Sequence, residues 1–158
     1  KTDPYTSSFW KILANKSGEL TQNNSKTNYL YYEFNAANVG FSKQDQGFVL
    51  AVEDIKPFTP KLASLMKLNN KETERLLFEL QHAAKDLPTG TEYIKVSLVP
   101  QSELDSKLPL KVFPKPEHVN RYHFIFTPTG KNEKTIKPTV PEVKRGTSTL
   151  VELGASAK

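Results

Sequence analysis

The three histidines are the side chains best suited to metal binding or acid–base chemistry in this sequence. They are His82, His118 and His123, and no two have the i, i+4 helical spacing or the i, i+2 strand spacing that brings paired imidazoles to one metal ion. Cysteine is absent, which excludes thiolate metal sites, disulfides and a cysteine nucleophile. We therefore expect no metal site and no cofactor, and we interpret each histidine as a surface or structural residue.

The carboxylates and hydroxyls also lack a pattern typical of catalysis. Glu53 and Asp54 are adjacent at the end of a predicted strand, so they point to opposite faces and do not form a matched acid–base pair. The acidic residues of the following helix alternate with lysine and arginine, which is typical of a solvated face. The sequence has no Gly-x-Ser-x-Gly elbow, no Walker loop and no Gly-x-Gly-x-x-Gly motif. We expect no catalytic residue, and hence a protein that is not an enzyme.

Positive charge is concentrated between residues 107 and 137. The chain has a formal net charge of +5 and a pI near 9.3, and this stretch accounts for the whole net charge. Its basic residues are candidate contacts for phosphates or for an acidic partner: Lys107, Lys111, Lys115, Arg121, Lys131, Lys134 and Lys137. Lysine predominates, whereas base readout favours the arginine fork, and exposed lysines also keep strand edges from aggregating. Nucleic-acid binding is therefore the alternative function.

Two helices with a short turn are predicted within residues 61–80. Ala63 supplies a small residue, Leu68-Asn-Asn forms the turn, and residues 72–80 form the second helix. This arrangement resembles the helix-turn-helix of winged-helix regulators, which implies that the second helix would read DNA. Lys67 stands where that motif usually has glycine, and acidic residues on the reading helix would repel phosphates. A capped, two-part core helix explains the same residues.

Alternating apolar residues predict the strands that must position any site. Strands are predicted at 28–34, 47–55, 92–99 and 121–127, with a late strand at 149–153. We expect the first two to pair antiparallel, with three side chains facing the core: Leu30, Tyr32 and Phe34. Segregated strands and helices favour an α+β domain, with an antiparallel sheet of four to five strands and a two-part helix packed on one face. A β-sandwich with a helical insertion is the alternative.

The two halves of the helix carry separate start signals. Thr59 is the expected N-cap of the first half, with Pro60 at its first helical position. Asn69 and Glu72 predict a reciprocal capping box at the start of the second half, which runs to about Lys85.

Polar segments flank the predicted α+β core at 28–127. Residues 1–27 form an N-terminal arm with a short helix capped within residues 6–8, and residues 128–158 form an extended basic tail rich in Pro, Thr and Lys. The apolar residues of these segments are candidate anchors on a partner: Phe9 and Trp10 in the arm, and Val140, Val143, Leu150, Val151 and Leu153 in the tail. The strand at 149–153 would join the sheet edge of a partner. The leading hypothesis is a non-enzymatic interaction or assembly module with other protein subunits as partners.

Two further expectations concern a third function and the location of the protein. Abundant aromatic residues suggest a hydrolase or carbohydrate-binding protein that uses Tyr29, Tyr31 or Trp10. The chain begins at Lys1 and its only methionine is Met66, so a removed secretory signal would explain this start together with the absence of cysteine. We therefore expect an exported (periplasmic, cell-surface or secreted) protein of a cell-envelope complex over a cytoplasmic one. No apolar run approaches the roughly 20 residues that cross a bilayer.

Overall fold

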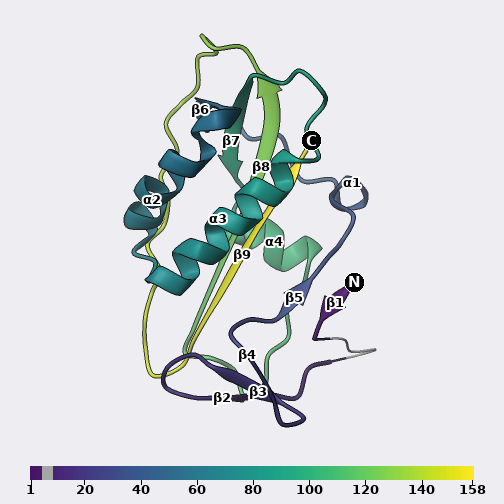
Figure 1. Cartoon of the computed structure of the whole chain (residues 1–158), viewed down its shortest axis with the longest axis vertical. Coiled ribbons are helices and arrows are strands. Elements are labelled where there is room, and N and C mark those ends of the chain that lie inside the picture. Colours follow the sequence, from purple (N-terminus) through teal and green to yellow (C-terminus); the bar gives the residue numbers. More distant parts are fainter. Residues whose placement is uncertain (5–8) are drawn as a thin grey trace. The chain divides into compact units, whose positions relative to one another are not determined.

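A computed structural model describes residues 1–4 and 9–158 of the chain. The chain divides into two compact units, Lys1–Asn35 and Ala36–Lys158. Figure 1 shows the elements of both units in chain order.

The first unit consists of short antiparallel strands. β1 (Thr2–Asp3) pairs with β5 (Tyr31–Tyr32), and a three-stranded sheet has the order β2 (Leu13–Ala14), β3 (Leu20–Gln22) and β4 (Ser25–Thr27). A two-residue turn joins β3 to β4, and both of its asparagines, Asn23 and Asn24, have positive φ. Asparagine tolerates this left-handed backbone, which matches the twist of a tight hairpin.

Two expectations for this region are wrong. The predicted strand 28–34 shrinks to β5 and pairs with β1, not with the strand near residue 50, and Leu30, Tyr32 and Phe34 are only half-buried. The short helix expected in the N-terminal arm is absent from residues 9–27, which contain β2, β3 and β4, while its predicted cap at 6–8 lies outside the described residues. The physical reason is that Ser17-Gly18 closes a turn between β2 and β3, with the Gly18 amide donating to the Asn15 carbonyl.

The second unit is built on a four-stranded sheet. Its spatial order is β6 (Phe48–Ala51), β7 (Tyr93–Leu98), β8 (His118–Thr129) and β9 (Thr149–Ala157). The first three strands are mutually antiparallel, and β9 runs parallel to β8 at the edge. The α+β prediction is confirmed, with the difference that the edge strand makes the sheet mixed.

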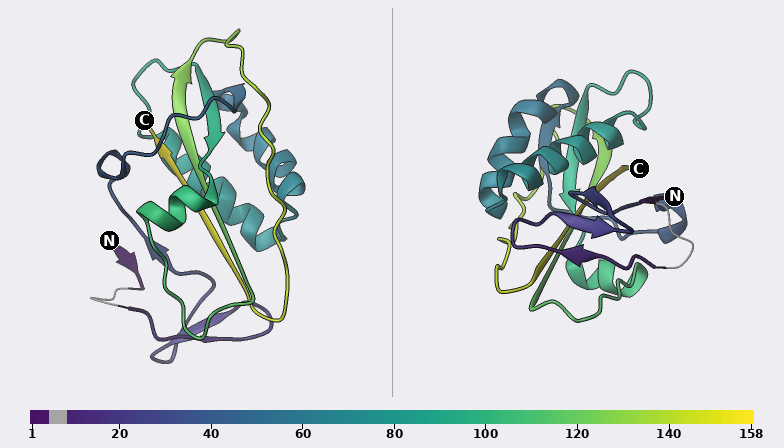
Figure 2. Two further views of the ribbon diagram at one scale, coloured as in Figure 1. Left: turned by 180° about the vertical axis from the view of Figure 1, so that it is seen from behind. Right: turned by 60° about the horizontal axis from the view of Figure 1, so that its bottom comes forward.

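Helices cover both faces of this sheet. After α1 (Ala36–Val39) and a 3₁₀ turn at Val52–Asp54, α2 (Ile55–Met66) and α3 (Asn70–Ala84) pack on one face (Figure 1), and α4 (Gln101–Lys107) lies against the other (Figure 2). The core between α2, α3 and the sheet is apolar, and its most deeply buried large residues include Leu62, Met66, Leu76, Leu80, Ile94, Phe124 and Phe126.

The helix starts test the predicted capping signals. The capping box at Asn69 and Glu72 is confirmed, with both reciprocal hydrogen bonds present. The predicted start of the first helix is wrong, because α2 begins at Ile55 and Pro60 lies inside it. The Thr59 hydroxyl donates to the Ile55 carbonyl within the helix instead of capping it. The link between β7 and β8 contains α4.

Candidate protein-interaction site

The crossover segment, residues 130–148, determines where β9 lies. A parallel strand next to β8 must start at the same end of the sheet as β8, so the chain has to return along its whole length. In its first half the crossover segment is bonded to the residue just before β6: the Gly47 amide donates to the Ile136 carbonyl at 3.0 Å, and the Thr135 hydroxyl donates to the Gly47 carbonyl at 2.9 Å. These contacts hold the crossover segment at the start of β6.

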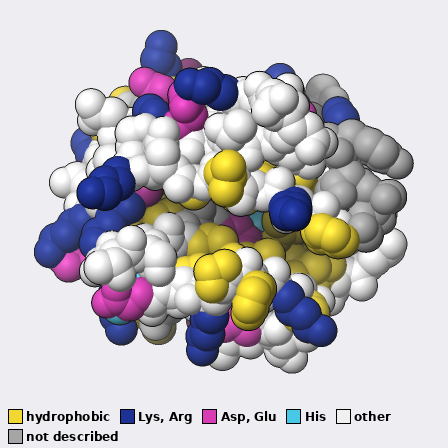
Figure 3. All heavy atoms as spheres, turned by 90° about the horizontal axis from the view of Figure 1, so that it is seen from below, with side chains coloured by type: hydrophobic (Ala, Val, Ile, Leu, Met, Phe, Trp, Pro, Cys, Tyr) yellow, Lys and Arg dark blue, Asp and Glu magenta, His cyan; other side chains and the backbone are white. Residues whose placement is uncertain are grey.

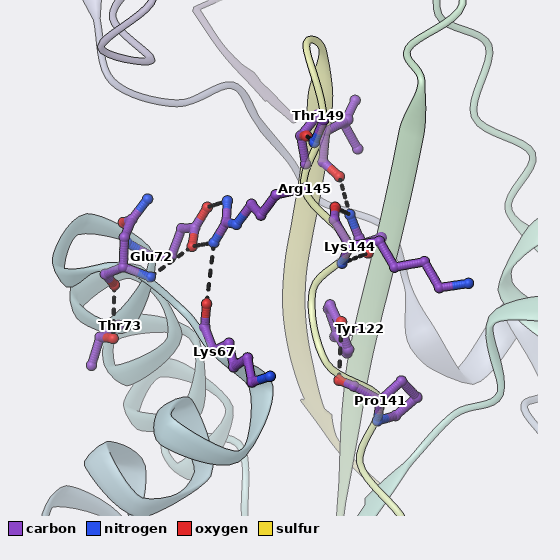
Figure 4. A network of polar contacts seen from close by, with 12 residues as sticks. Lys67, Glu72, Thr73, Tyr122, Pro141, Lys144, Arg145 and Thr149 are labelled. Atoms are coloured by element: carbon purple, nitrogen blue, oxygen red, sulfur yellow. Dashed lines mark hydrogen bonds and ion pairs between the residues drawn. The ribbon is translucent and has the colours of Figure 1, made fainter.

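Further along, the crossover segment is held against the helix pair. The Val143 amide donates to the Met66 carbonyl at the end of α2, and the Tyr122 hydroxyl donates to the Pro141 carbonyl at 3.1 Å. Arg145 makes two hydrogen bonds to the Glu72 carboxylate, at 2.7 and 2.5 Å (Figure 4). The hydrogen bond to Glu72 raises the pKa of Arg145. The glutamate of the capping box thus also fixes the crossover segment.

Reciprocal side-chain hydrogen bonds fix the start of β9. The Asn120 amide group donates to the Lys144 carbonyl at 3.0 Å, and its oxygen accepts from the Lys144 amide at 2.8 Å. The Gly146 amide donates to the Thr149 hydroxyl at 3.0 Å (Figure 4). Because Asn120 belongs to β8, these contacts set the register in which β9 begins.

Hydrogen bonding to β8 uses one half of the backbone of β9. The His118 amide donates to the Ser148 carbonyl, and the Lys158 amide donates to the Phe126 carbonyl, so the even-numbered residues face β8. In a strand the neighbouring residues direct their N–H and C=O groups to the opposite edge. The outward residues are Thr149, Val151, Leu153, Ala155 and Ala157. Among the described residues, no backbone hydrogen bond joins these groups to another segment.

The backbone N–H and C=O groups of these residues point outward, but their side chains do not block the edge. Val151, Leu153, Ala155 and Ala157 pack against the core, and α3 lies across β9 on that face (Figure 1). Natural proteins keep long edge strands from pairing with another chain by placing proline, lysine or a β-bulge in them. β9 has no proline and no lysine, and it pairs with β8 without a bulge over its whole length. β9 therefore presents a regular, unguarded edge of nine residues.

The opposite face of β9 is held by an ion-pair cluster. Arg121 donates to Glu152 through Nε at 2.8 Å and through Nη2 at 3.1 Å, and its Nη1 lies 3.0 Å from Asp105 of α4. The Arg121 side chain is 1% exposed. Glu152 is the one charged residue of β9, and this pair turns it toward the protein interior. The charge that would protect the edge is thereby neutralised.

His123 contributes a second polar contact on the same face. Its Nε2 lies 3.0 Å from the Ser156 hydroxyl, and its ring packs against Phe41 in a tilted arrangement with centroids 5.2 Å apart. A Cβ at Gly154 would lie 2.8 Å from the imidazole Nδ1, so glycine leaves the space that the ring occupies beside the strand. Burial, with a smaller effect of Arg121, lowers the pKa of His123 to about 4. The buried imidazole is thus neutral at pH 7 and fixes the C-terminal half of β9.

The predicted anchors of the tail fall into two groups. Val143 is 6% exposed and belongs to the core of this chain, and Val140 packs beside it, so both contact the chain itself. Leu150, Val151 and Leu153 lie in β9, where the late strand is present and extends to Ala157.

The two aromatic anchors of the N-terminal arm lie in the first unit. Phe9 is 71% exposed, and Trp10 is half-buried with its indole N–H donating to the Pro4 carbonyl at 2.7 Å.

The predicted basic contacts are also divided. Arg121 is buried between two carboxylates, so it is not the surface phosphate contact that the sequence suggested. Lys107 pairs with Glu103 at 2.8 Å. The other members are exposed: Lys111, Lys115, Lys131, Lys134 and Lys137. On the face drawn in Figure 3, lysine and arginine side chains occupy several separate places, with acidic side chains next to some of them.

The second helix of the predicted helix-turn-helix has much of its surface inside the protein. Leu76, Glu79 and Leu80 of α3 are buried, and Arg75 pairs with Glu79. Tyr29 and Tyr31, suggested as carbohydrate contacts, lie in the first unit, where the Tyr31 hydroxyl donates to Glu33 at 2.7 Å.

The described residues contain no cluster of three or more His, Asp or Glu side chains able to hold a metal ion. His82 stacks on Phe78 along an open groove of about 580 Å³, and His118 lies 3.6 Å from Glu117. Across residues 1–4 and 9–158, no helix has the length and apolar character needed to cross a bilayer. Comparison with family models, curated proteins and solved structures gave no match to this chain.

Proposed function

We propose that this protein is a non-enzymatic protein–protein interaction module that binds an extended segment of a partner along β9. The observation that carries the proposal is the unguarded outer edge of β9, where five residues each offer one N–H donor and one C=O acceptor. An extended peptide that adds a strand to such an edge gains affinity from main-chain hydrogen bonds. Each bond contributes roughly 0.5–1.5 kcal/mol net.

The rigidity of β9 supports this function. The strand is fixed at its start by Asn120, at its middle by Arg121 and near its end by His123. A preformed edge loses little conformational entropy when a partner strand binds, so more of the hydrogen-bond energy appears as affinity. The opposite edge is less suited to bind a partner strand because β6 has only four residues and the crossover segment pairs with the residues just before it.

Amide hydrogen exchange tests the proposal in a register-specific way. The probe is an extended peptide selected for binding from a random display library. In the free protein, the amides of Val151, Leu153 and Ala155 should exchange quickly, because no backbone hydrogen bond to another described residue protects them, while those of Glu152 and Gly154 are protected by β8. Binding should protect the first set. Binding that leaves the exchange of all three unchanged would contradict the proposal.

A proline substitution provides the matched variant. Ala155→Pro removes an outward N–H and leaves the ladder to β8 intact, and Ala155→Ser keeps that N–H at the same position. Peptide affinity should fall at least tenfold for Ala155→Pro and stay within twofold for Ala155→Ser, with circular dichroism confirming that both variants are folded. Equal affinity of two folded variants would show that the peptide binds elsewhere.

A further inference from the structure

We infer that the partner strand on β9 is β9 of a second copy of this chain, antiparallel to the first, so that two sheets join across a twofold axis. This inference rests on the proposed function and names its partner. It comes from the sequence of β9, TLVELGASA, read against itself in the reverse direction.

One register uses every outward backbone group. An antiparallel pair centred on Leu153 places Thr149 opposite Ala157, Val151 opposite Ala155, and Leu153 opposite its own copy. All five outward residues of each copy then form hydrogen-bonded pairs, in which the two partners exchange both N–H···O bonds. A register centred on Glu152 or on Gly154 leaves one outward residue without a partner. Of these three registers, only the one centred on Leu153 therefore gives every outward residue of β9 a partner.

Side-chain size is complementary in the same register. The first five residues of β9 include Leu150, Val151 and Leu153, whereas the last four residues, 154–157, are Gly, Ala, Ser and Ala. Antiparallel pairing therefore sets a large residue against a small one at every position except the axis, where Leu153 meets Leu153. Directly opposed side chains on one face of a sheet lie about 4.5–5.5 Å apart, so such alternation fills space without overlap.

Charge selects this register over its neighbour. Centred on Leu153, the pairing places Glu152 opposite Gly154, and the carboxylate remains with Arg121 on the far side of the sheet. Centred on Glu152, the pairing sets two glutamates directly opposite each other, which is destabilising. The only charged residue of the strand therefore disfavours the register centred on Glu152. A lysine on an edge strand discourages pairing with another strand, and β9 has none.

Disulfide trapping tests the inference, because the chain has no cysteine of its own. In the proposed pair the two Leu153 Cα atoms lie about 5.5 Å apart, within the range that a disulfide spans. Leu153→Cys should therefore form a covalent dimer under mild oxidation. Ala155→Cys is the matched control: it lies on the same face of the same strand, but its Cα is about 14 Å from its copy in this register.

We expect most of the Leu153→Cys protein to be linked under conditions that leave Ala155→Cys monomeric. Equal linking of both variants, or of neither, would overturn the inference. Since Leu153 packs against the core, the unmodified protein supplies a second measurement: protection of the Val151, Leu153 and Ala155 amides should rise with protein concentration, together with the sedimentation-derived mass. A monomer at all concentrations that still binds selected peptides along β9 would overturn the second-copy inference alone. A β9 edge that no ligand protects would overturn the proposed function as well.

Discussion

At the scale of single residues, β9 depends on polar side chains that strand β8 directs away from the helix pair. Arg121 satisfies Glu152 and Asp105 together, and it does so with almost no exposed surface. Removing one partner of a buried pair leaves an uncompensated charge, which costs about 3–5 kcal/mol. The position of β9 is therefore tied to charges that local sequence patterns do not connect, since Arg121 and Glu152 are far apart along the chain.

His123 makes stability depend on pH in a defined window. Its pKa is about 4 in the folded protein and near 6.5 in an unfolded chain, so the unfolded chain binds the proton more readily. The free energy of unfolding contributed by this group is fully present above pH 6.5, falls as the pH drops toward 4, and is then lost. The free energy of unfolding that is lost across this pH window is about 3 kcal/mol.

The measurement is urea unfolding of the wild type and of His123→Gln between pH 7.5 and 4.5. Glutamine retains a hydrogen-bonding group near Ser156 but does not titrate. The wild-type free energy of unfolding should fall steeply over this range and that of the variant should fall less. Parallel pH curves for the two proteins would show that another group causes the loss.

At the scale of elements, the second helix shows what a local signal determines. The Asn69 side chain accepts from the Glu72 amide at 2.9 Å, and the Glu72 carboxylate accepts from the Asn69 amide at 2.9 Å. Replacement of such a cap by alanine costs about 1 kcal/mol. We expect Asn69→Ala to lower the free energy of unfolding by this amount in urea titrations. The neighbouring Asn70→Ala is the control, since Asn70 is exposed at the first helical position; an equal loss in both variants would contradict the capping role.

The strands show where local signals end. Alternation located β7 and β8, because Ile94, Val96, Phe124 and Phe126 are buried on one face. It did not reveal that residues 28–34 contribute only β5, since alternation specifies faces and not pairing partners. The seven-residue α4 has one buried residue, Leu104, too few to show a helical period. The open edge of β9 depends on its parallel pairing with β8, and no residue within β9 signals that pairing.

At the scale of the whole molecule, the folded units differ from the divisions that composition suggests. Composition placed a core at 28–127 between two polar segments, whereas the second compact unit spans Ala36–Lys158. The crossover segment has few apolar residues, yet it adds Val143 to the core and leads the chain to β9, which completes the sheet. A polar average conceals such a segment when a few well-placed side chains and backbone pairing hold it.

Two truncations distinguish these divisions. Residues 36–158 should fold without the first unit and unfold cooperatively, because their sheet, both helix layers and the Arg121 cluster are complete. Residues 28–127 should not, because loss of β9 exposes Tyr122 and Phe124 and leaves Arg121 without Glu152. Thermal unfolding followed by circular dichroism measures both fragments. A cooperative transition in 28–127 would mean that β9 docks on a core that is stable without it. The absence of a cooperative transition in 36–158 would mean that the second unit depends on the first.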